Sequence, residues 1–188
     1  MKKIVLVFSL LLFMQWNIAA QITITSSTVA NTLVAKLVGT GVTYSNPTLT
    51  CATNGAGYFV STNAMLGIDS GVLLTTGYAK NNGVNVGANN PANVQAGANR
   101  AYTVGDVDLY NLAHTYNTSI TTTDINDVCK LEFDFIPQGD TIRFNYKFAS
   151  EEYPDYVCSD FNDYFAFFIN GTPGYPTATN LAKVPGTN

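Results

Sequence analysis

The sequence is poor in charge, and basic residues are the scarcer kind. Lysine and arginine together number 9 against 13 acidic residues, and charged residues make up 12% of the chain. No segment gathers the basic side chains that neutralise phosphates, which argues against nucleic acid as a partner. With His114 as the one histidine, no Ser–His–Asp triad can be assembled with any support, and no zinc site of histidines and closely spaced cysteines is predicted.

Long apolar runs are missing as well. The run at residues 4–14, broken only by Ser9, is shorter than the roughly 20 residues that a membrane-spanning helix needs. It follows the basic Lys2 and Lys3 and precedes the small Ala19 and Ala20. This order predicts a signal peptide over residues 1–20 and a mature chain over 21–188 that is secreted or displayed on the cell surface, without a transmembrane segment.

Cysteine is scarce, and no CxxC motif occurs. Cys51, Cys129 and Cys158 all lie in the predicted exported part. An oxidising destination allows one disulfide, with the third cysteine free or paired outside the chain. The alternative is three small buried thiols, which is favoured for Cys129 because it continues the apolar face of a predicted strand. The pairing stays open.

Short β-branched runs punctuated by Gly, Asn, Thr and Ser dominate what is present. One of them reaches a predicted turn at Asn46 and Pro47. Residues 28–38 are the one good helix candidate, through the spacing of Val29, Leu33 and Leu37, and residues 110–117 allow a helical turn or two. The pattern predicts a mainly β fold, an antiparallel, jelly-roll-like β-sandwich with one short N-terminal helix. Residues 21–188 have the size of a single domain.

The clearest predicted strands are residues 130–135 and 142–148. Each alternates apolar with polar or charged residues, which is typical of an antiparallel sheet with one wet face. A turn at residues 137–140 suits a hairpin between them, with acids of the first strand opposite Arg143 and Lys147 of the second. Four aromatic residues are expected to face one core: Phe133, Phe135, Phe144 and Tyr146.

An acidic segment follows this hairpin and precedes the aromatic run 164–169. Its carboxylates repel one another unless water, basic residues or a cation offsets the charge. An oxygen-only donor set suits calcium, although the spacing is not that of an EF-hand. The predicted ligands are Glu151, Glu152, Asp160, Asn162 and Asp163, with Asp155 in or near the shell. The alternative is a solvated acidic loop without metal.

The same acids do not predict catalysis. Glu151 and Glu152 are adjacent, so on an extended chain they point to opposite faces. A glycosidase needs two carboxylates that converge across roughly 5–10 Å, and no pair stands out here. We therefore expect no enzymatic activity.

Several segments resemble the choice-of-anchor L domain, a module of exported, often large surface proteins of Bacteroidota. They are GVLLTTG, DVDL, KLEFDFIPQGDTIRFNYKFASEEYPDY, FNDYFAFFING and NLAKVPGT. The resemblance covers roughly residue 28 to the end, and FASEEYP with NDYFAFF is its most specific part. It implies a secreted β-rich module without an established enzymatic activity. The family pattern continues past the PGT segment, so the domain is expected to be truncated at its C-terminal end.

These observations predict a non-catalytic extracellular or cell-surface binding or adhesion module, stabilised by calcium. Its expected partner is an extracellular ligand, a glycan or a surface protein. The alternatives are a carbohydrate-active enzyme or glycan-binding accessory domain, and a purely structural spacer in a surface protein.

Overall fold

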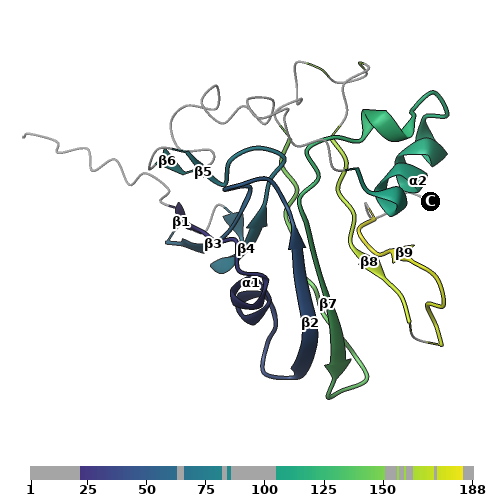
Figure 1. Ribbon diagram of the computed structural model, residues 1–188. Helices are drawn as coiled ribbons and strands as arrows, with labels where there is room; N and C mark the ends of the chain where they lie inside the picture. Colours follow the sequence, from purple (N-terminus) through teal and green to yellow (C-terminus); the bar gives the residue numbers. More distant parts are fainter. Residues whose placement is uncertain are drawn as a thin grey trace, which may run out of the picture.

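The computed structural model describes residues 22–62, 66–81, 84–85, 105–150, 156, 159, 163–171 and 173–183 (Figure 1). The predicted signal peptide, the predicted cleavage site and the predicted C-terminal truncation lie outside these residues. Within them, no helix combines the length and the apolar character needed to cross a bilayer.

A three-stranded antiparallel sheet contains β1 (Ile22–Ser26), β3 (Ala56–Ser61) and β4 (Ser70–Leu74), in the order β1-β3-β4. Ile24 lies opposite Phe59 in this sheet, and both side chains are buried in one core cluster with Ala79. Gly57 lets β1 approach closely, because a Cβ at this position would lie 2.6 Å from the Thr25 carbonyl oxygen.

A second antiparallel pair joins β2 (Val42–Thr50) to β7 (Lys130–Pro137), with Tyr44 opposite Phe135. The predicted turn at Asn46 and Pro47 is instead a bulge inside β2, where the register shifts between Ser45 and Thr48. Asn46 has a φ of 52°, and its Nδ2 donates to Asp134 Oδ2 at 2.7 Å. A bulge tolerates proline because the ladder is already interrupted there.

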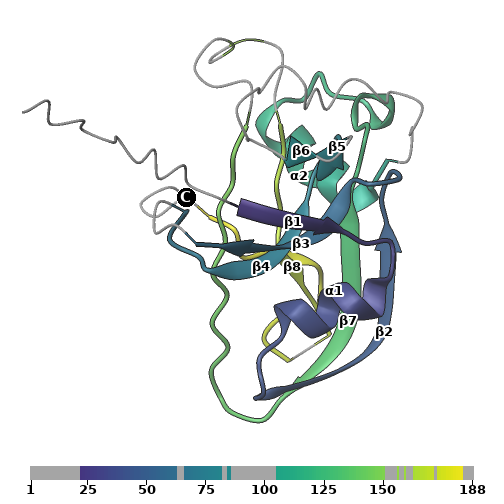
Figure 2. The ribbon, with the colours of Figure 1, turned by 90° about the vertical axis from the view of Figure 1, so that its left-hand side faces the viewer.

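The predicted hairpin between residues 130–135 and 142–148 is wrong. β7 pairs with β2, and residues 141–150 continue as an extended chain without a hydrogen-bonded ladder. In Figure 2 this light-green segment runs along the left side of the molecule, away from β2 and β7. It lies beside residues 163–169, because the Phe144 and Phe167 rings stack with centroids 4.0 Å apart.

Two α-helices accompany these strands. α1 (Ala30–Leu37) buries Leu33 and Val34 and lies against β2 and β4. It falls inside the segment for which a helix was predicted, but its N-terminal position is not supported, because β1 precedes it. α2 (Val107–Tyr116) is a second helix, followed by the 3-10 turn η4 (Thr122–Asp124).

Two short pairs complete the ladders: β5 (Lys80–Asn81) with β6 (Val84–Asn85), and β8 (Phe168–Ile169) with β9 (Thr179–Asn180). The described part of the chain is therefore mainly β and antiparallel, as predicted. Its separate small sheets do not establish the predicted jelly-roll sandwich.

Candidate functional site

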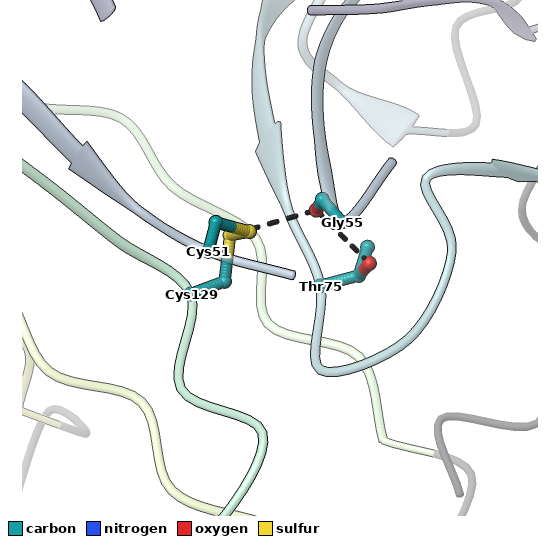
Figure 3. The surroundings of a disulfide bond; sticks show 4 residues. All are labelled: Cys51, Gly55, Thr75 and Cys129. Carbon is teal, nitrogen blue, oxygen red and sulfur yellow. Dashed lines mark hydrogen bonds between the residues drawn. A yellow bond between two sulfur atoms is a disulfide. The ribbon is translucent and has the colours of Figure 1, made fainter. Parts of the chain in front are cut away.

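The Cys51–Cys129 disulfide links the end of β2 to the beginning of β7, the two paired strands of one sheet, and lies next to Gly55, which precedes β3 of the other sheet (Figure 3). Cys51 follows β2 and Cys129 precedes β7. Because Cys129 is bonded to Cys51, the prediction of a buried thiol at Cys129 is wrong. The Cys129 Sγ, which carries no hydrogen in the disulfide, lies 3.6 Å from the Gly55 carbonyl oxygen. That oxygen accepts hydrogen bonds from the Thr75 backbone N–H at 2.9 Å and the Thr75 Oγ1 at 3.1 Å. Cys158, the third cysteine, lies outside the described residues.

Asp106 connects helix α2 to the beginning of β7. Its Oδ1 accepts the Leu109 N–H at 2.9 Å, which caps the helix N-terminus. Its Oδ2 lies 2.8 Å from Lys130 Nζ, and the same Nζ lies 3.1 Å from Glu132 Oε2. Glu132 thus pairs with Lys130, not with the bases expected in the predicted hairpin.

This network shifts two pKa values. Burial alone would raise the pKa of Asp106, but its bonds to Lys130 and Leu109 outweigh burial and hold it below 3.8. Burial alone would lower the pKa of Lys130, but Asp106 and Glu132 raise it above 10.5. Both shifts favour the charged pair. The arrangement holds the N-terminus of α2 against the beginning of β7.

Only one predicted calcium ligand, Asp163, falls in the described part of the chain. Glu151, Glu152, Asp160 and Asn162 lie outside it, as does Asp155. Asp163 Oδ2 accepts a hydrogen bond from Ser150 Oγ, so residues at the two ends of the acidic loop are in contact. Among the described residues, no group of three His, Cys, Asp or Glu side chains could hold a metal.

Five aromatic side chains form a row on the two segments that flank the acidic loop in the sequence. Tyr146 and Phe165 lie 5.3 Å apart, and Phe148 and Phe165 lie 5.9 Å apart, between ring centroids. Three of the rings reach solvent: Tyr146 is 39% exposed, Phe148 52% and Phe165 36%. We call this set the aromatic row; it consists of Phe144, Tyr146, Phe148, Phe165 and Phe167.

Sequence reasoning missed this row, although its signal was present. Residues 142–148 alternate apolar with polar residues, and this alternation predicts a buried face. The expectation of one common core for Phe133, Phe135, Phe144 and Tyr146 is wrong. Phe133 contacts the rings of Phe135 and Tyr44, whereas Phe144 and Tyr146 belong to the aromatic row.

An open groove of about 330 Å³ borders the same segment. It is lined by Gly67 and Ile68, which precede β4, and by residues 144–147. Lys147 lies at its border and is exposed, with its Cε 3.7 Å from the position that a Cβ on Gly67 would take.

Comparison with known families gives a match along almost the whole chain. Residues 21–188 match the family model described as the choice-of-anchor L domain. Neither the comparison with curated proteins nor that with solved structures found a match.

Proposed function

Because the chain belongs to the choice-of-anchor L domain family, a non-enzymatic type of surface module, we propose that it binds or adheres to an extracellular partner. The proposed partner is a glycan or a surface protein, and the proposed location is outside the cell. The disulfide supports export, since such bonds persist mainly in oxidising compartments.

The exposed aromatic row carries the binding proposal. Aromatic rings that remain in solvent expose apolar area that a monomeric fold would otherwise bury, and contiguous patches of this kind mark interaction sites. Tyrosine and phenylalanine also supply large contact areas at small entropy cost when their rings are held by neighbours. The stacking of Phe144 on Phe167 provides such support.

We further propose that calcium orders the acidic loop next to this row. Glu151, Glu152, Asp160, Asn162 and Asp163 would hold the ion through oxygen atoms, which suits a hard cation. The Ser150–Asp163 contact supports this proposal, because joined loop ends reduce the entropy that a metal must remove. In this arrangement the loop and the aromatic row would form one calcium-ordered binding surface.

The second candidate function is that of a carbohydrate-active enzyme or its glycan-binding accessory domain, which the flat rings would also suit. Planar, partly exposed rings at centroid spacings of 5.3 and 5.9 Å offer a platform against which the apolar face of a sugar ring could lie. These two differ in one measurable property: a carbohydrate-active enzyme would cleave or modify the bound glycan, and an accessory domain would leave it unchanged.

Adhesion of protein-coated beads tests the binding role. Beads are applied to a panel of immobilised polysaccharides and glycoproteins, and we expect retention on at least one surface. Tyr146→Ser combined with Phe148→Ser should abolish that retention. The matched control combines Val107→Ser with Ile136→Ser, two exposed apolar residues outside the row. No retention anywhere, or equal retention of both double variants, would contradict the proposal.

A further inference from the structure

Residues 141–149 form an extended segment whose backbone has no hydrogen-bond partner among the described residues. No backbone N–H or C=O of this segment takes part in a bond within the described ranges, whereas neighbouring Phe167 accepts from Leu181 N at 2.8 Å. The segment is exposed along most of its length. A row of unpaired N–H and C=O groups on an extended chain is a template for another strand.

The polar side of this segment is basic. Arg143, Asn145 and Lys147 alternate with the aromatic residues and are exposed. Within the described residues, neither Arg143 nor Lys147 forms an ion pair, since the acids of β7 are engaged by Lys130 and Asn46. The groove along residues 144–147 leaves space beside the segment.

We propose that residues 141–149 bind one extended acidic peptide strand by β-strand addition. The added strand would pair its backbone with the free groups of the segment. Its acidic residues would lie on the face of Arg143 and Lys147, and its alternate apolar residues would extend the aromatic row on the other face. This proposal deepens the binding role proposed above and rests on it.

Charge selects this occupant over a second copy of the chain. If two copies paired antiparallel about Asn145, Arg143 of each would lie opposite Lys147 of the other. Like charges directly opposite one another destabilise a sheet. An acidic strand removes that repulsion and satisfies the unpaired backbone. An acidic polysaccharide would meet the two charges but would leave the backbone groups without strand partners.

A fluorescent peptide in which glutamate alternates with valine is the probe, and fluorescence anisotropy reports its binding to the protein. Two control peptides accompany it: one with lysine in place of glutamate, and one with alternate backbone nitrogens methylated. We expect saturable binding of the first peptide alone, because methylation removes the N–H donors that a β-ladder needs while keeping the charge.

Lys147→Glu should weaken binding of the probe by about tenfold or more, since it replaces attraction with repulsion. Lys36→Glu, the same change at an exposed residue of α1, is the matched control and should leave binding unchanged. Circular dichroism establishes that both variants are folded.

Three outcomes overturn the proposal: no saturable binding of the glutamate peptide, equal binding of the methylated peptide, or equal effects of Lys147→Glu and Lys36→Glu. If the protein bound an acidic polysaccharide, and bound the glutamate peptide equally well with and without backbone methylation, then Arg143 and Lys147 would be part of a glycan-binding site. Bead adhesion that depends on Tyr146 and Phe148 but persists without peptide binding would sink this proposal alone. The binding function would then stand.

Discussion

Cys51 and Cys129 lie 78 positions apart in sequence, yet their disulfide joins the end of β2 to the beginning of β7. The bond closes a loop that contains β3, β4 and helix α2. Its sulfur atoms also contact the Gly55 segment between the two larger sheets. This junction therefore ties two adjacent strands at the end of their ladder, where Thr50 pairs with Lys130, and Gly55 before β3 packs against it.

Replacing both Cys51 and Cys129 by serine should lower the free energy of unfolding by about 4 kcal/mol, because a closed loop of this length strongly restricts the unfolded chain. Urea unfolding measures the change. A reductant should destabilise the native protein by a similar amount and leave the double variant unaffected. Equal stability of the variant and the native protein would show that the bond does not stabilise the β2–β7 pair.

Gly55→Ala should destabilise the protein by about 1–3 kcal/mol through overpacking. A Cβ there would lie 2.7 Å from Cys51 Sγ and 3.2 Å from the carbonyl oxygens of Ala52 and Gly77. Gly139→Ala is the matched control, because a Cβ at that position meets nothing within 4 Å. Thermal or urea unfolding should separate the two variants; indistinguishable stabilities would contradict the geometry of the junction.

Asp106→Ala should cost about 2 kcal/mol at neutral pH, because it removes a helix cap and one partner of Lys130. The folded pKa of Asp106 is lowered below 3.8. Its stabilisation is therefore present above pH 3.8 and is lost as the pH falls through the folded pKa. The difference in free energy of unfolding between the native protein and the Asp106→Ala variant should therefore become smaller at acidic pH. Asp108→Ala, an exposed carboxylate in the first turn of the same helix, should cost under about 1 kcal/mol.

Millimolar calcium should raise the melting temperature of the protein, because an ion that binds only the folded state stabilises it by mass action. Asp163→Ala should abolish the rise while the calcium-free variant stays folded. Asp140→Ala removes another exposed carboxylate, in the turn after β7, and should keep the rise. If neither calcium nor chelator changed the melting temperature, the loop would be a solvated acidic surface without a bound metal.

The local elements were largely predictable, and their partners were not. Residues 28–38 encode α1 through the spacing of Val29, Leu33 and Leu37, and the alternation of Leu131, Phe133 and Phe135 predicts β7. Alternation fixes which residues share a face, but it does not identify the neighbouring strand. The short turn after β7 suggested residues 142–148 as its partner strand. In the structure β7 pairs with β2 instead, and Phe144 stacks on Phe167.

The candidate site was predictable in composition more than in arrangement. The acids around residue 151 could be recognised from sequence, and the contact between Ser150 and Asp163 agrees with a loop closed at its ends. The disulfide could not be chosen, because three cysteines allow three pairings and spacing does not rank them. The exposed aromatic row was hidden because alternation looks the same whether the apolar face is covered or open.

The most direct test of the proposed calcium-ordered binding surface is bead adhesion measured in calcium and then in excess chelator. We expect native beads to be retained in calcium and released by chelator, and Asp163→Ala beads to be poorly retained in both. Asp140→Ala beads should behave like native ones. Retention that is unchanged by chelator and by Asp163→Ala would contradict the claim that the loop and the aromatic row act as one surface.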